Sequence, residues 1–371
     1  MVEGEKSPDS AEVGVHRRGG IAELRVAALT SGLASPSARF RVRQLREPLL
    51  SHGIALQEFA AQPRSAPPHE WRRRPFWALG SLVNGVYRAG RSYSHDVTLL
   101  HRTFVSRALT FEPLTRSPRV FDFDDAIWLH SESMTRRVIE LSDAVICGND
   151  HLAKWARRFS SNVAIVPTGI DTERYTPVAG PCRDDLVLGW IGTSSNLPQL
   201  EELAPALEGV IQQFPGTRLR VVCDRAPKFT GKVLERTEFV PWEESREVAE
   251  IQSFDIGLMP VADSEWGRGK CAFKLIQYMS CGVPVVASPV GMNGLILEEF
   301  RVGLAPSSQQ EWAEAIRVLL ADPDARGSFG AAGRAAAVKV FDSRITASQV
   351  AKVITAVYEN SRSRLRIPSH G

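Results

Sequence analysis

Apolar residues form short continuous runs along the chain, separated by stretches in which they recur every three or four positions. Runs of four to six apolar residues predict buried strands, and the periodic stretches between them predict helices. One such helix begins near Ser37, carries Val42, Leu45 and Leu49 on one face, and ends at Gly53. In the first half, the predicted strands cover residues 24–29, 54–59, 97–100, 120–123, 144–146 and 163–166.

The same pattern restarts after residues 177–181, a proline-bounded stretch that we interpret as a linker. The predicted strands there cover residues 186–191, 219–223, a short stretch near Phe239, 255–259 and 284–287. The predicted helices cover residues 197–214, 243–252, 271–280 and 309–360. Strands that alternate with helices favour parallel sheets with helices on both faces. We therefore predict an α/β fold of two Rossmann-like domains facing a central cleft, with ligands at the carboxyl ends of the strands.

The predicted domains are an N-terminal domain over residues 21–178 and a C-terminal domain over residues 179–345. Residues 1–20 are polar and predict a disordered tail. Residues 346–371 predict a C-terminal helix, which could pack back on the N-terminal domain, and a tail.

Composition narrows the class of protein. The chain has 371 residues, of which 43% are hydrophobic and 23% charged, enough for two cores. Its net charge of +3 is too small to favour a nucleic-acid partner. The sequence lacks an apolar run long enough to span a membrane, an apolar signal core, and both common glycine-rich nucleotide motifs. Scattered cysteines fit reduced thiols in a cytoplasmic protein: Cys147, Cys182, Cys223, Cys271 and Cys281.

Two segments of the C-terminal half have residues suited to a diphosphate. Gly192, Thr193 and Ser194 join a predicted strand to a predicted helix. The glycine permits a ligand to approach the backbone closely, and the free amide groups at the start of the helix favour binding of an anion. A capped turn would need the same residue types. In the second segment, residues 266–274, the cations Arg268, Lys270 and Lys274 could neutralise charge on a leaving group. The alternative there is a solvated basic loop.

The second segment carries a resemblance to a known family. Residues 269–288, Gly-Lys-Cys-Ala-Phe-Lys-Leu-Ile-Gln-Tyr-Met-Ser-Cys-Gly-Val-Pro-Val-Val-Ala-Ser, resemble the donor-site segment of family 4 glycosyltransferases of the GT-B fold. Residues 120–128 are similar to a signature of one branch of that family. Residues 166–171 and 254–260 are similar to other family segments, and the likeness runs in order from about residue 22 to 355.

The resemblance implies transfer of a sugar from a nucleotide diphosphate sugar to an acceptor, with retention and without a tightly bound metal or other cofactor. It places the donor on the C-terminal half, where Lys274 would bind a phosphate and Gln277 would contact the ribose, and the acceptor on the N-terminal half. Many relatives carry two glutamates eight positions apart. Here Gly269 and Gln277 stand in their places, so a sugar-contacting carboxylate is missing.

In the N-terminal half, Asp124 and Asp125 follow a predicted strand. By resemblance they lie at the cleft, where Asp124 would face the transferred sugar and Asp125 the acceptor; metal binding and capping are the alternatives. Arg39 and Arg41 suit an acceptor with phosphate or carboxylate groups, and Arg102 is a weaker candidate of the same kind. Each could instead belong to a solvated helix face.

Residues 71–91, from Trp71 to Arg91, combine apolar residues at helical spacing with flanking arginines. This pattern is typical of a helix lying on a membrane surface, and also of a core-facing helix with a basic outer surface. The first interpretation would make the protein peripheral at the membrane and the acceptor lipid-linked rather than a small molecule. Two other functions remain open: a catalytically silent partner of a transferase, and a nucleotide-sugar epimerase or hydrolase.

Overall fold

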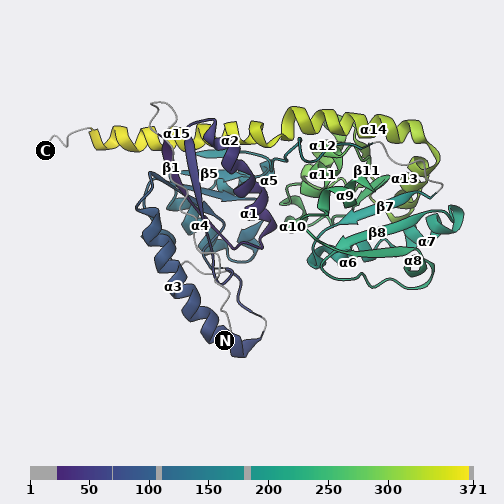
Figure 1. The fold of residues 1–371 in the computed structure, drawn as a ribbon, viewed down its shortest axis with the longest axis horizontal. Coiled ribbons are helices and arrows are strands. Elements are labelled where there is room, and N and C mark those ends of the chain that lie inside the picture. Colours follow the sequence, from purple (N-terminus) through teal and green to yellow (C-terminus); the bar gives the residue numbers. More distant parts are fainter. Residues whose placement is uncertain (1–22, 69, 106–110, 179–184, 367–371) are drawn as a thin grey trace, which may run out of the picture.

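The computed structural model describes residues 23–68, 70–105, 111–178 and 185–366. Two lobes lie side by side, one formed by the first half of the chain and one by the second (Figure 1). The predicted tail at residues 1–20 and Cys182 lie outside the described residues. The other four cysteines are buried and unpaired by disulfides.

The N-terminal lobe is built on a six-stranded sheet in the order β2-β1-β3-β4-β5-β6, with every neighbouring pair parallel. Its strands are β1 (Leu24–Thr30), β2 (Ile54–Ala60), β3 (Val97–His101), β4 (Arg119–Phe123), β5 (Ala144–Cys147) and β6 (Val163–Ile165). Its helices are α1 (Pro36–Arg41), η1 (Arg43–Leu45), α2 (Arg46–Leu50), η2 (Trp71–Arg73), α3 (Arg74–Ser92), η3 (Glu112–Leu114), η4 (Ile127–Leu129), α4 (Glu132–Glu140) and α5 (Asp150–Ala156).

The C-terminal lobe repeats this architecture with a parallel sheet in the order β12-β11-β10-β7-β8-β9. Its strands are β7 (Val187–Ile191), β8 (Arg218–Cys223), β9 (Thr237–Pro241), β10 (Ile256–Met259), β11 (Val285–Ala287) and β12 (Gly303–Leu304). Its helices are η5 (Ser194–Asn196), α6 (Leu197–Glu201), α7 (Ala204–Gln213), α8 (Gly231–Glu235), α9 (Glu247–Gln252), α10 (Glu265–Arg268), α11 (Phe273–Ser280), α12 (Met292–Phe300), α13 (Gln309–Ala321), α14 (Pro323–Ala336) and η6 (Ala337–Phe341).

The predicted strands are confirmed, while several predicted helices are divided. Residues 197–214 form α6 and α7, because Pro205 occupies the first turn of a new helix, where a missing amide proton costs nothing. Pro323 separates α13 from α14 in the same way. The strand β12 and the helix α12 were absent from the prediction.

Apolar side chains pack on both faces of each sheet and form the two cores. The last helix, α15 (Ser343–Arg366), runs back from the C-terminal lobe along the N-terminal one (Figure 1). Its residues Ala347, Val350 and Ile354 are buried in the same cluster as Val26 of β1 and Leu99 of β3. The chain therefore crosses twice between the lobes.

Candidate active site

A chain of hydrogen bonds links the carboxyl ends of β3 and β4 to the start of α1. The two ring nitrogens of His101 lie 2.8 Å from a carboxylate oxygen of Asp122 and 2.8 Å from the Ser37 hydroxyl. Ser37 in turn donates to the carboxylate of Asp124. Parallel strands that end together and a helix that begins above them bring these residues into one place. This chain of hydrogen bonds, which runs through His101 and Ser37, fixes the position of the Asp124 carboxylate.

Arg102 holds the paired carboxylates from the other side. Its Nη2 lies 2.7 Å from Asp124 Oδ1 and 2.5 Å from Asp125 Oδ2, and its Nε lies 3.0 Å from Asp124 Oδ1. The backbone of Arg102 has a φ of 60°, a left-handed conformation that a non-glycine residue adopts at a cost of about 1–3 kcal/mol. Such strain concentrates at functional sites, because the surrounding structure must maintain it.

The two carboxyl groups have pKa values shifted in opposite directions. Burial opposes ionisation of Asp124, but the charges of Arg102 and Arg41 and the hydrogen bond from Ser37 act together against it and lower the pKa of that carboxyl below its usual range. Burial raises the pKa of Asp125, and the nearby Asp124 carboxylate adds to that rise against the effect of Arg102. The two carboxyl groups therefore differ in acidity, although Arg102 contacts both.

The segment from α10 to α11 reaches across from the C-terminal lobe to these carboxylates. The side-chain amide of Asn149 donates to the carbonyl oxygens of Gly269 at 3.1 Å and Lys270 at 3.0 Å, and the Cys271 thiol donates to the Asp124 carbonyl at 3.1 Å. A Cβ atom on Gly269 would lie 2.7 Å from the Ala126 Cβ. Only a residue without a side chain allows this close approach between the lobes.

Two lysines of this segment lie at the crossing. Lys270 Nζ is 5.3 Å from the centre of the Trp266 ring, and Lys274 Nζ is 5.5 Å from that of Trp190. Burial, together with the weaker effect of the positive charge of Lys270, lowers the pKa of Lys274 to about 7. A Cβ on Gly192 would lie 2.6 Å from Lys274 Cε, so the glycine lets the lysine pass over the turn. An anion placed between these cations would reverse the shift of Lys274.

Other predicted donor residues have partners elsewhere. Arg268 is about half exposed and pairs with Asp263 at 2.8 Å, on the outside of the segment. The amide and hydroxyl of Ser194 donate to Asp224 at 2.7 and 2.8 Å, and Thr193 Oγ1 lies 2.9 Å from Ser195 Oγ. Among the predicted donor residues, Gly192, Lys270 and Lys274 are therefore brought together, and the others are not.

Gln277 and Arg39 meet at a buried carboxylate that the sequence analysis did not single out. Glu247 accepts from Gln277 Nε2 at 2.8 Å, from Arg39 Nη1 at 2.8 Å and from Trp242 Nε1 at 2.9 Å, and the Tyr175 hydroxyl also donates to it. Arg39 belongs to α1 and Glu247 to α9, so this cluster joins the two lobes. The expectation that Arg39 faces an acceptor in a solvent-filled cleft does not fit its place, since the side chain is buried against Glu247.

Arg41 is likewise fully engaged inside the N-terminal lobe. Its guanidinium contacts both oxygens of Asp122, at 2.5–3.1 Å, and donates to the Val166 carbonyl and the Thr168 hydroxyl at 3.1 and 3.2 Å. These contacts neutralise the charge of Asp122 and connect the end of β4 to residues 166–168, which follow β6. Arg41 does not line the cavity of about 530 Å³ in the N-terminal lobe, whereas Arg102 does.

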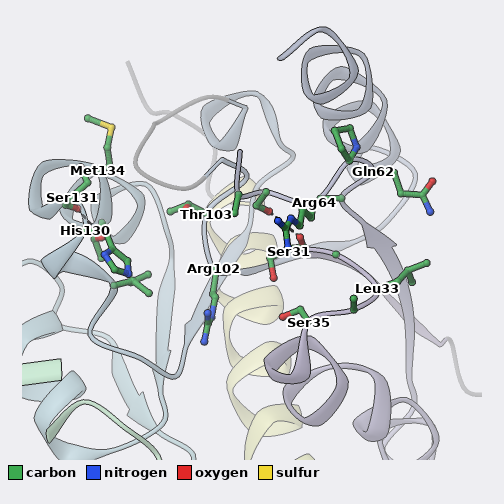
Figure 2. Close-up of a pocket in the computed structure, with 18 of the residues that line it drawn as sticks. Ser31, Leu33, Ser35, Gln62, Arg64, Arg102, Thr103, His130, Ser131 and Met134 are labelled. Atoms are coloured by element: carbon green, nitrogen blue, oxygen red, sulfur yellow. Dashed lines mark hydrogen bonds between the residues drawn. The ribbon is translucent and has the colours of Figure 1, made fainter. Parts of the chain in front are cut away.

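A cavity of about 530 Å³ is lined in part by Arg102, the residue that pairs with Asp124 and Asp125. Figure 2 shows it between the turn after β1, the segment after β2, and η4 with the start of α4. Arg102 and Thr103 line it, and Trp266 of α10 adds a side chain from the C-terminal lobe, with its ring 5.0 Å from that of His130. Other lining residues are Ser31, Leu33, Ser35, Gln62, Arg64, Ser131 and Met134.

Within the described ranges, no group of three or more His, Cys, Asp or Glu side chains could hold a metal ion. No helix in the described part of the chain is both long enough and apolar enough to cross a bilayer.

Comparisons with known proteins agree with this architecture. Residues 185–322 match the family model "Glycosyl transferases group 1". The alpha-maltose-1-phosphate synthase of Mycolicibacterium smegmatis is 25% identical over 267 residues, which cover 61% of this chain and 66% of that protein. The chain spans 48% of the length of another curated relative, the D-inositol 3-phosphate glycosyltransferase of Rhodococcus erythropolis.

Solved structures show the same fold over nearly the whole chain. The sucrose-phosphate synthase of Thermosynechococcus elongatus superposes with a TM-score of 0.68 at 17% identity, covering 91% of this chain and all of that one. HepE of Anabaena, in complex with UDP and glucose, gives a TM-score of 0.66 at 17% identity over 90% of this chain and all of that one. The chain thus has the two-domain α/β GT-B fold, and its C-terminal lobe carries the match to the group 1 glycosyltransferase family.

Proposed function

We propose that this protein transfers a sugar from a nucleotide diphosphate sugar to an acceptor bound in the cavity of the N-terminal lobe. The observation that carries the proposal is the meeting of Lys270 and Lys274 with the Asp124–Asp125 pair where the two lobes touch. The match to group 1 glycosyltransferases, and the complex of HepE with UDP-glucose, support a nucleotide-sugar donor.

The donor diphosphate would lie between the Gly192 turn and the two lysines. Negative charge grows on a diphosphate as the bond to the sugar breaks, and preorganised cations there lower the barrier. The pKa of Lys274 is about 7 before binding, so the amine is only partly protonated near neutral pH. It would take up a proton when the diphosphate binds. Two lysines supply the positive charge, so the proposed reaction needs no metal ion.

The reacting carbon would lie next to Asp124. Its carboxylate stays ionised and fixed by Arg102 and Ser37, so it can steady the positive charge that develops on the sugar. Asp125 would lie on the acceptor side, where its carboxyl, whose pKa burial raises, could exchange a proton with an acceptor hydroxyl. Retention at the reacting carbon is part of the proposal, on the strength of the family resemblance.

The acceptor would enter the cavity lined by Arg102, Arg64, Thr103 and Ser35. Two arginines and several hydroxyls suit a polyhydroxylated acceptor that carries an anionic group. The names of the curated relatives, an alpha-maltose-1-phosphate synthase and D-inositol 3-phosphate glycosyltransferases, support an acceptor of this kind.

A thermal-shift panel of UDP-, GDP- and dTDP-sugars tests the proposal, because a ligand that binds the folded state raises the unfolding temperature. The nucleotide sugar that stabilises the protein is then incubated with and without candidate acceptors, and the products are analysed. Release of nucleoside diphosphate together with a glycosylated acceptor supports transfer. A modified or free sugar formed without an acceptor identifies an epimerase or hydrolase, and stabilisation without any turnover identifies a silent partner protein.

A further inference from the structure

The helix α3 and the turn before it expose an unusual number of large apolar side chains. Phe76 is 80% exposed, and six further side chains on this segment are more than half exposed: Trp71, Leu79, Leu82, Val83, Val86 and Tyr87. Phe76, Leu79, Val83 and Val86 follow one another at helical spacing and share one face. Contiguous apolar surface of this kind marks an interaction site on a folded protein.

The opposite face of α3 anchors it to the N-terminal lobe through small and polar residues. A Cβ on Gly85 would lie 2.2 Å from the Phe111 ring, and Arg88 is buried with its guanidinium donating to the carbonyl oxygens of Phe59 and Thr30 at 2.9 and 2.8 Å. The apolar face therefore points away from the core, and the interpretation of residues 71–91 as a core-facing helix with a basic outer surface is wrong. Figure 1 shows the helix projecting from the lobe.

The charged residues from Trp71 to Tyr93 are all positive, and the preceding Glu70 pairs with Arg73 at 2.7 Å. From Trp71 to Tyr93 the sequence contains five arginines and no acidic residue. Arg72, Arg73 and Arg74 are exposed at the start of the helix, and Arg91 is exposed near its end. Arg72 also lies over the exposed ring of Trp71, 5.6 Å from its centre. An apolar stripe with tryptophan and flanking arginines fits the boundary between acyl chains and anionic headgroups better than a protein surface.

We propose that α3 docks the protein on an anionic lipid bilayer, with its apolar face inserted at the headgroup boundary. Phe76 and Leu79 would reach below the phosphates, while Arg72, Arg74 and Arg91 would pair with them. The helix would lie in the plane of the interface, held to the lobe by Gly85 and Arg88.

The docking face adjoins the proposed acceptor cavity. The segment after β2, which includes cavity residues Pro63 and Arg64, packs directly on α3. The Trp77 indole donates to the Arg64 carbonyl at 2.9 Å, and a Cβ on Gly80 would lie 3.0 Å from the Pro63 ring. Docking would therefore bring this wall of the cavity close to the bilayer. If the proposed transfer is correct, which this step requires, the acceptor is a lipid-linked molecule with its head group in the cavity.

Vesicle flotation of the full chain tests the docking, using phosphatidylcholine vesicles with and without phosphatidylglycerol. The wild type should float with the anionic vesicles and much less with the neutral ones. The double variant Phe76→Asp/Leu79→Asp should bind the anionic vesicles at least about tenfold more weakly, because two inserted apolar side chains are lost. The matched control is Leu234→Asp, at an exposed leucine of α8 in the other lobe, which should bind as the wild type does.

Three outcomes would overturn the docking proposal: no flotation of the wild type with either vesicle, equal flotation of the double variant, or concentration-dependent self-association of the wild type that the double variant abolishes without any vesicle binding. The nucleotide-sugar thermal shift of each variant is measured in parallel. An unchanged shift in a double variant that no longer floats separates docking from donor binding. Flotation of a wild type that no nucleotide sugar stabilises would support docking and contradict the proposed function.

Discussion

At the scale of single residues, the site contains ionisable groups whose pKa values are shifted by burial and by neighbouring charges. Burial and Lys270 lower the pKa of Lys274 to about 7, and burial raises the pKa of Asp125 beside the ionised Asp124. The lowered pKa of Lys274 and the raised pKa of Asp125 both mean that the charged forms of these groups are less favourable in the folded protein than in the unfolded chain. Each shift makes sense if a polyanion and a reacting sugar occupy the space between them.

Replacing Lys274 by Met should stabilise the protein in a pH-dependent way. The pKa of Lys274 is about 7 in the folded protein and 10.5 in the unfolded chain, so the unfolded chain binds more protons between these values. The burden of Lys274 on stability is therefore fully present below about pH 7 and fades toward 10.5. Unfolding temperatures of Lys274→Met should exceed those of the wild type at the lower end of this range and converge at the upper end.

The same variant should bind nucleoside diphosphate roughly tenfold or more weakly, since one charge-assisted contact is lost. Calorimetric titration gives this affinity. A stability difference that does not change with pH, or an undiminished affinity, would contradict the place given to Lys274.

The sequence pointed to Lys270, Lys274, Asp124 and Asp125 because residue type and motif position are visible in it. It could not reveal Glu247, whose acidic, helix-starting context in residues 243–247 resembles a solvated surface. Glu247 is buried only because Arg39, 208 positions earlier in the chain, contacts it across the lobes. The sequence predicts Arg41 as an acceptor ligand, whereas the structure pairs it with Asp122. The sequence around Arg41 does not show this pair, because Asp122 lies 81 positions later in the chain.

At the scale of elements, the segment between α10 and α11 is one of the places where the C-terminal lobe contacts the N-terminal one. Gly269 packs closely on Ala126, where an added Cβ would lie 2.7 Å from the Ala126 Cβ. The close approach brings Lys270 within electrostatic reach of Asp125.

Adding one methyl group at Gly269 should separate the lobes locally. The Cβ of Gly269→Ala would lie 2.9 Å from the Ala126 backbone nitrogen, so backbone must shift. We expect faster amide hydrogen exchange in residues 124–128 and 265–272 and about a tenfold or greater loss of turnover, because misplacement by about 1 Å is costly in a preorganised site.

Gly327→Ala provides the control. Gly327 lies in α14 and has no atom within 4 Å of the added Cβ, so this variant should keep full turnover and gain about 0.5–1 kcal/mol in the free energy of unfolding. Gly269→Ala with wild-type exchange and turnover would show that the lobes do not need this contact.

Strands were the elements best predicted from the sequence. Strands buried on both faces form continuous apolar runs, as in β7, where all five residues are buried. Helix boundaries were harder to predict, since Pro205 and Pro323 begin new helices without interrupting the apolar periodicity. The two residues of β12 carry no periodic signal at all, and only pairing with β11 defines them.

At the scale of the whole molecule, the lobes are joined by the crossing of α15 and by the buried Arg39–Glu247 pair. The side chains of Arg39 and Glu247 are 10% and 3% exposed, so neither charge is compensated by water. Tyr175, Gln277 and Trp242 complete the shell around the carboxylate. The relative position of the two halves of the site depends on this cluster.

Arg39→Ala should therefore destabilise the protein by roughly 3 kcal/mol, because it leaves Glu247 buried without its counter-charge. Urea unfolding measures the change. The matched control is Arg136→Ala, which removes an exposed pair with Glu140 on α4 and should cost less than about 0.5 kcal/mol. Equal effects of the two variants would mean that the Arg39–Glu247 pair does not stabilise the contact between the two lobes.

The most direct test of the proposed transfer is the rate at which nucleoside diphosphate is released from the donor sugar nucleotide, in the wild type and in Lys270→Ala. The exposed Lys232→Ala in α8 serves as the control. If Lys270 stabilises the departing diphosphate, its removal should slow release by about 10²–10³-fold, while Lys232→Ala matches the wild type. Release by Lys270→Ala at the wild-type rate would contradict the account, because the reaction would then proceed without the charge that defines this site.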